Sequence, residues 1–220
     1  MKKTVALLTE PSVPRIALSL DLLRRLAFNV NFFSFTSVPD FFMILIMTVG
    51  MLRGSEAAAL LEEDVELKVV EGQEVLMILV QTSKTYQLRI DDTVFVAAGP
   101  DKMTCPIEWF KIYRGFHTRG APTFFHSANA TDPPSGIRAI SGPTTNTALK
   151  KRVAAVGVNP SGYGSHSCRR GGTTAAVNAE VDIFLVERHG RWKSDAVYSY
   201  VDISVKRRLM VSIGVLSGIS

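Results

Sequence analysis

The spacing of apolar residues changes twice along this chain. Residues 4–29 are expected to form a leading segment and a helix, and residues 39–67 a core helix, a turn and a second helix with an acidic end. The most apolar stretch, residues 41–52, is about a dozen residues long, whereas a helix needs roughly 20 residues to span a bilayer. We therefore predict a buried core helix at this position.

A different pattern begins at residue 67, where apolar residues become β-branched and alternate with polar ones. Turn signals divide residues 67–98 at three places, which are Glu71-Gly72, Ser83-Lys84 and Asp91-Asp92. This pattern predicts a small antiparallel sheet of about three strands.

Helical spacing returns after residue 100. It predicts helices within residues 105–116, 143–157, 167–180, 181–190 and 194–203. A loop rich in proline and glycine, residues 118–141, is the best candidate for a flexible insertion. The helices on its two sides have apolar faces that need one another, so the loop is not a domain linker. The predicted fold class is α+β, mainly helical with one small antiparallel sheet.

Composition is consistent with one globular domain. The chain has 220 residues, of which 46% are hydrophobic, enough to bury a substantial core. Cys105 and Cys168 are too few for a disulfide framework or a zinc cluster, and the opening residues lack a full apolar signal region. An intracellular protein is therefore expected.

Positive charge is concentrated in the C-terminal part of the chain. The net charge is +5, and residues 146–210 contain eleven Lys and Arg against five Asp and Glu. Residues 54–75 contain seven acidic residues against Lys68 alone. The basic part is suited to contact with phosphate groups.

The sequence GYGSHSCRRGGTTAAV, residues 162–177, places charge at the start of a helix of small residues. Ser165 or Ser167 can cap its first turn. His166 and Arg169 fall on one helical face, while Arg170 is turned about 100° away. One anion can therefore be met by His166, Arg169 and the helix end together.

Three further segments carry candidate chemistry. Arg53 directly follows the predicted core helix, and Lys84 lies at the expected tip of a hairpin. Trp192 follows a glycine turn, and Tyr198 and Tyr200 lie on a predicted amphipathic helix.

In this order, the residues resemble the catalytic domain of the tyrosine recombinases, the phage-integrase family. The phrases HSCRRGGTTAA and GRWKSDAVYSYV are most similar to the branch found in DIRS-like and Crypton-like mobile elements of eukaryotes. The resemblance covers residues 11–205 and leaves residues 206–220 as a C-terminal tail. It implies that the anion is a scissile DNA phosphate.

The resemblance also implies a role for each residue. Tyr200 is the nucleophile, and Arg53 and Arg169 stabilise the negative charge of the phosphorane. His166 accepts the tyrosine proton or donates to the phosphate, and Lys84 protonates the departing 5′ oxygen. The product is a 3′-phosphotyrosyl link, formed without a metal ion or another cofactor.

One catalytic position departs from the family pattern. Most members have His or Trp immediately after the turn glycine, whereas Arg191 follows Gly190 here and Trp192 comes one residue later. We prefer Trp192 as the phosphate contact and Arg191 as a DNA-backbone contact, with His189 as a third choice. Tyr198 competes with Tyr200 for the role of nucleophile, and the family spacing favours Tyr200.

The expected partner is double-stranded DNA, bound by a homo-oligomer, a tetramer in this family, and in a eukaryotic host the location is the nucleus. The expected DNA-phosphate contacts are Arg170, Arg191, Lys193, Lys150, Lys151 and Arg152. Members of the family usually have an N-terminal DNA-clamp domain, and about ten residues before the expected core are too few to form one. We therefore expect a catalytic fragment, a truncated copy of an element or a compact variant. The apolar tail either packs onto a neighbouring protomer or folds back onto its own core.

Two other functions fit the same residues. A type IB topoisomerase-like enzyme would nick and reseal one duplex through the same tyrosine chemistry. A non-catalytic DNA-binding remnant would keep the basic surface alone.

Overall fold

The computed structural model describes residues 15–81, 93–127, 137–192, 194–201, 203, 205, 208–210 and 212–213. The helices are α1 (Leu20–Phe28), α2 (Ser37–Val49), α3 (Gly54–Ala59), α4 (Pro106–Arg114), α5 (Gly142–Ala155), α6 (Ser165–Asn178) and α7 (Ile183–Gly190). The strands are β1 (Val65–Val70), β2 (Gln73–Leu79), β3 (Thr93–Ala97), β4 (His126–Ser127) and β5 (Arg138–Ala139). Short 3-10 helices are η1 (Glu62–Asp64), η2 (Lys102–Thr104), η3 (Pro160–Gly162) and η4 (Asp195–Tyr200).

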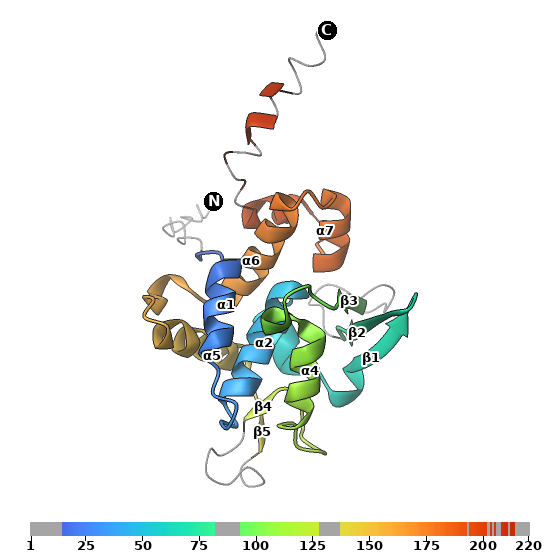
Figure 1. Ribbon diagram of the computed structural model, residues 1–220, viewed down its shortest axis with the longest axis vertical. Coiled ribbons are helices and arrows are strands. Elements are labelled where there is room, and N and C mark those ends of the chain that lie inside the picture. Colours follow the sequence, from blue (N-terminus) through green and yellow to red (C-terminus); the bar gives the residue numbers. More distant parts are fainter. Residues whose placement is uncertain are drawn as a thin grey trace, which may run out of the picture.

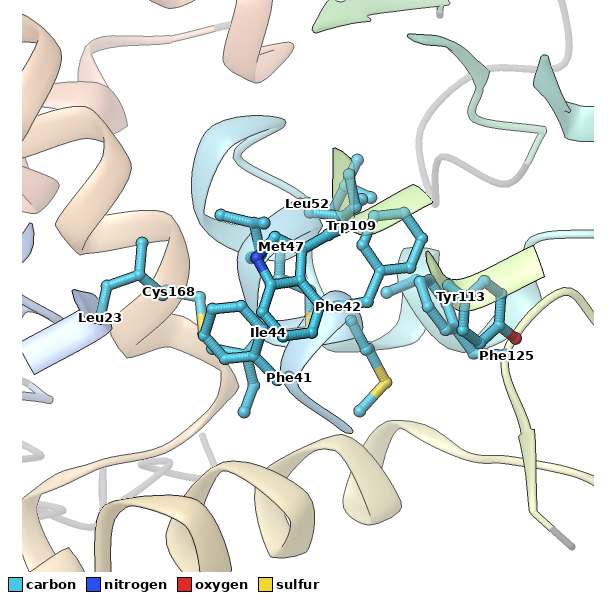
Figure 2. Close-up of a cluster of buried hydrophobic side chains, with 14 of the residues drawn as sticks. Leu23, Phe41, Phe42, Ile44, Met47, Leu52, Trp109, Tyr113, Phe125 and Cys168 are labelled. Carbon is cyan, nitrogen blue, oxygen red and sulfur yellow. The ribbon is translucent and has the colours of Figure 1, made fainter. Parts of the chain in front are cut away.

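Helix α2 lies at the centre of the molecule, with α1, α4, α5 and α6 packed around it (Figure 1). Ten of its residues are buried, which confirms the predicted core helix. Its side chains meet those of α4 and α6 in one continuous cluster that includes Phe41, Phe42, Trp109 and Cys168 (Figure 2). None of the described helices is long and apolar enough to cross a membrane.

The predicted three-stranded antiparallel sheet is confirmed, with the order β1-β2-β3. Glu71 and Gly72 join β1 to β2 with φ values of 50° and 80°, and both central residues of a type I′ hairpin turn need such positive values. Leu76 and Val96 are paired across β2 and β3 on the face that packs against the core. Most of the connection between β2 and β3, residues 82–92 with Lys84 among them, lies outside the described residues.

The segment at residues 118–141 is only partly the insertion that the sequence predicts. Phe124 and Phe125 within it are buried in the core, and Phe124 N donates a hydrogen bond to Leu60 O at 2.7 Å. Strands β4 and β5 then pair as a short antiparallel ladder. Two apolar side chains therefore anchor part of this loop to the domain, a contact that the high proline and glycine content of the segment conceals.

Residues of the C-terminal tail that the structure describes are exposed, among them Leu209, Met210 and Ile213.

Candidate DNA-cleavage site

Helix α6 begins after Gly164, which is its N-cap. Ser167 Oγ accepts a hydrogen bond from Gly164 N at 3.1 Å, so this serine closes the first turn from within the helix. The predicted cap at Ser165 or Ser167 is therefore replaced by Gly164, and Ser165 is the first helical residue. This placement still leaves His166 and Arg169 on one face at the start of α6.

The first turns of α3, α5 and α6 meet beside this face. A Cβ atom added to Gly54 would lie 2.8 Å from Ser165 Cβ and would also overlap the side chain of Thr145. Asn146 Oδ1 accepts a hydrogen bond from Ser165 N at 2.5 Å. Since the N-terminus of a helix carries partial positive charge, the meeting of these ends favours an anion.

Tyr200 and His166 face each other at this place. The Tyr200 hydroxyl lies 3.4 Å from His166 Nδ1. Burial lowers the pKa of His166 below its ordinary value, and the positive charges of Arg169, Arg53 and Arg15 lower it further. The imidazole is therefore neutral at pH 7 and can accept a proton. Sequence reasoning did not single out Arg15, because its nearness to His166 arises only from folding.

Helix α6 also holds the backbone that carries Tyr200. Thr174 Oγ1 donates to Tyr200 O at 3.1 Å, and Arg170 Nη1 donates to Ser199 O at 3.0 Å. The predicted amphipathic α-helix is a 3-10 helix, η4, in which the side chain of Tyr198 is 58% exposed. Tyr200, not Tyr198, is the tyrosine that lies next to His166.

Arg169 is fully buried, with an exposed fraction of 0%. Its Nη1 and Nη2 atoms donate to Met51 O at 2.5 Å and to Gly190 O at 2.6 Å. The Trp192 ring lies over the guanidinium group, 3.9 Å from Cζ to the ring centroid. Burial lowers the pKa of Arg169 to about 9, so the group stays protonated at pH 7.

Arg53 lies at the N-cap of α3 and is held by Glu56, a residue to which sequence reasoning assigned no role. Arg53 Nη1 donates to Glu56 Oε1 at 2.5 Å, and Arg53 N donates to Glu56 Oε2 at 2.7 Å. Burial raises the pKa of Glu56, but the charges of Arg191 and Arg53 outweigh it, and the pKa lies below its ordinary value. The three-residue spacing of Arg53 and Glu56 at the start of a helix was the signal in the sequence from which this contact could have been predicted.

The three candidates for the catalytic His or Trp position after the turn glycine point in different directions. The Trp192 ring lies 5.6 Å from that of Tyr200. Arg191 turns away and donates through Nη2 to Glu56 Oε2 at 2.7 Å, and His189 Nε2 lies 2.8 Å from Val49 O. Of the three, only Trp192 lies against both Arg169 and Tyr200.

The remaining predicted phosphate contacts are spread over the molecule. Arg152 is buried, with Nη2 3.1 Å from Asp40 Oδ2 and Nη1 2.8 Å from Ser37 Oγ, so its guanidinium group forms a structural ion pair. Its predicted contact with DNA stays a prediction. On the same helix, Lys151 is exposed and Lys150 is half-buried. Lys193 and Lys84 lie outside the described residues.

Comparison with solved structures finds similar chains among DNA recombinases. XerH site-specific recombinase, in a post-cleavage complex with its difH substrate, matches with a TM-score of 0.62 and 15% identity, over 92% of this chain and 53% of that one. XerA recombinase matches with a TM-score of 0.64 and 14% identity, over 94% and 65%. FLP recombinase in a Holliday-junction complex matches with a TM-score of 0.54 and 15% identity, over 85% and 44%.

This chain therefore spans 53% and 65% of the first two of these proteins. No protein-family model matches its sequence, and no curated protein does so either. The resemblance to the DIRS-like and Crypton-like branch stays a prediction. At this level of identity the shared feature is the fold, and the fold of this chain is that of a tyrosine recombinase catalytic domain.

Proposed function

We propose that this chain cleaves and rejoins DNA at specific sites through a 3′-phosphotyrosyl intermediate. The observation that carries the proposal is the Tyr200 hydroxyl, 3.4 Å from a His166 whose lowered pKa leaves it neutral, beside the buried cation of Arg169. A nucleophile next to a proton acceptor and fixed cationic donors is what phosphoryl transfer without a metal ion requires. The DNA-bound recombinases of the same fold support the choice of DNA as substrate.

In the proposed reaction, Tyr200 Oη attacks phosphorus and its proton passes to His166. The bond between phosphorus and the 5′ oxygen breaks, and this oxygen takes a proton from Lys84. Arg53 and Arg169 stabilise the negative charge on the non-bridging oxygens. Because the new bond retains the energy of a phosphodiester, a 5′ hydroxyl from a second duplex can reverse the step without a nucleotide cofactor.

Arg169 needs a small rearrangement before it can bind a phosphate. Its bonds to Met51 O and Gly190 O use two of the five N–H groups of a guanidinium, and Trp192 covers one face. Since the side chain is fully buried, DNA binding must shift Trp192 or the segment of Tyr200 to admit the phosphate to the guanidinium edge. Trp192 then donates its indole N–H to the same phosphate.

The partners follow from this chemistry. Double-stranded DNA is the substrate, and strand exchange between two duplexes requires a homo-oligomer, for which we propose a tetramer. Lys150, Lys151 and Lys193 are the proposed contacts to flanking phosphates, while Arg170 holds the Tyr200 segment through Ser199 O. In a eukaryotic host we propose that the protein acts in the nucleus, because its substrate is DNA.

The test uses nicked suicide duplexes with random flanking sequences. Cleavage of such a duplex releases a short strand, so covalent protein-DNA species accumulate and are seen after denaturing electrophoresis. A second duplex with a free 5′ hydroxyl should then be joined to the cleaved strand. Resealing of the original strand alone would indicate a topoisomerase-like enzyme, and DNA binding without any adduct would indicate a non-catalytic remnant.

Lys84→Ala tests the proposed general acid. The variant should cleave ordinary DNA slowly, and a substrate whose 5′-bridging oxygen is replaced by sulfur should restore the rate, because a thiolate leaves without protonation. The same substrate should not restore Arg53→Ala, which lacks charge stabilisation instead. If the sulfur substrate does not rescue Lys84→Ala, then Lys84 is not the general acid, and His166 is the next candidate.

A further inference from the structure

Arg191 has a backbone conformation that is unfavourable for any residue other than glycine. The residue ends α7 and has φ 58° and ψ 41°, in the left-handed region. Glycine adopts this conformation without steric cost, whereas the Cβ atom of any other residue crowds the following carbonyl. The contacts of the Arg191 side chain therefore compensate for the steric cost of this backbone conformation.

Those contacts lie inside the protein. The Arg191 side chain is 6% exposed, with Nη2 2.7 Å from Glu56 Oε2 and Nη1 3.1 Å from His189 O. Glu56 is itself 2% exposed and binds Arg53 through both carboxylate oxygens. Arg191 is thus joined to Arg53 through one shared carboxylate.

The two neighbours of Arg191 contact the other proposed phosphate-binding arginine. Gly190 O accepts from Arg169 Nη2 at 2.6 Å, and the Trp192 ring lies 3.9 Å from Arg169 Cζ. The turn at residues 190–192 therefore touches Arg169 directly and Arg53 through Glu56.

The charges of Arg191 and Glu56 also affect how Arg53 can bind a phosphate. A buried carboxylate beside Arg53 competes with a DNA phosphate for the guanidinium N–H groups. Arg191 binds Oε2 of Glu56, and the carboxylate holds Arg53 through the backbone N–H and Nη1 only. Glu56 can then orient Arg53 while the other guanidinium nitrogens of Arg53, whose side chain is 41% exposed, face the phosphate.

We propose that Arg191 is a positioning residue, which orients Arg53 through Glu56 and does not itself bind the phosphate. The inference rests on the proposed DNA cleavage for its effect on rate. Its structural part, the hold on Arg53, is independent of that function and can be measured alone.

The first measurement is a cleavage cycle with Arg191→Gly and Arg53→Ala. Glycine suits the left-handed backbone, so the variant should fold. Arg191→Gly should lower the single-turnover cleavage rate by about tenfold to a hundredfold, as loss of a supporting contact does, with little change in the Kd for DNA. In the Arg53→Ala background it should cause little further loss, because it acts through Arg53. Full additivity of the two losses would overturn the proposal, and so would a wild-type rate in Arg191→Gly.

The second measurement needs no activity. The Arg53 amide donates to Glu56 Oε2, so its hydrogen exchange should be at least about tenfold faster in Arg191→Gly and in Glu56→Gln. The matched control is Asp40→Asn, which also removes a carboxylate from a buried arginine pair but lies in the first turn of α2, away from Arg53. It should leave exchange at Arg53 unchanged.

The two measurements separate the two proposals. If the wild-type chain forms no covalent DNA species, the proposed function fails, and exchange at Arg53 still decides the role of Arg191. If exchange at Arg53 is the same in wild type and Arg191→Gly, the positioning role fails whatever the cleavage rates are.

Discussion

Tyr200→Phe should abolish covalent attachment to DNA and leave the Kd for DNA nearly unchanged. Phenylalanine lacks only the attacking oxygen, and its ring can keep the contact with Trp192, whose centroid lies 5.6 Å from that of Tyr200. The adduct is measured with the nicked suicide duplex, and binding is measured with an intact duplex.

Tyr198→Phe is the matched control for this experiment. Tyr198 lies two residues earlier on the same 3-10 helix, and its side chain is 58% exposed. We expect a normal amount of adduct from this variant. An adduct that survives in Tyr200→Phe and disappears in Tyr198→Phe would reverse the assignment of the nucleophile.

Arg53→Ala and Arg169→Ala should each slow cleavage by about a hundredfold or more, the scale of one lost transition-state donor. Their effects on stability should differ. Arg169→Ala leaves the carbonyls of Met51 and Gly190 without their donor, at about 1–3 kcal/mol for each unpaired buried group. Arg53 is 41% exposed, and the buried Glu56 keeps its bond to Arg191 when Arg53 is lost, so Arg53→Ala should lower the free energy of unfolding by less than Arg169→Ala does. Thermal melting and single-turnover cleavage measure the two effects.

Arg170→Ala is the control for the pair of arginines. Arg170 follows Arg169 on α6 but bonds to Ser199 O on the Tyr200 segment. Its loss should slow cleavage less than the loss of Arg169. An equal loss would contradict the view that His166 and Arg169 form the working face of α6.

Local patterns predicted the fold because they report local physics. The continuous apolar run that becomes α2 can only be buried, and Glu71-Gly72 supplies the two positive φ values of a hairpin turn. The spacing of His166 and Arg169 places them on one helical face in any α-helix. These inferences need no knowledge of distant parts of the chain.

Contacts between segments that are far apart in the sequence could not be predicted from local patterns. Arg152 looks like a surface cation in the sequence, yet it pairs with Asp40, 112 residues earlier. Glu56 meets Arg191 across 135 residues, and nothing near Arg191 indicates that it turns toward a carboxylate. In the same way, choosing among Arg191, Trp192 and His189 required the packing of the turn against Arg169.

Two consecutive glycines in α6 restrict how far the sequence of this helix can diverge. A Cβ atom at Gly171 would overlap the carbonyl group of Leu18, and one at Gly172 would overlap that of Thr48, because backbone from two other segments packs against both positions. The helix that carries His166 and Arg169 therefore cannot slide or rotate by one residue without losing this close contact. A search for distant relatives should accordingly give the paired small residues after the arginine as much weight as the charged residues before them.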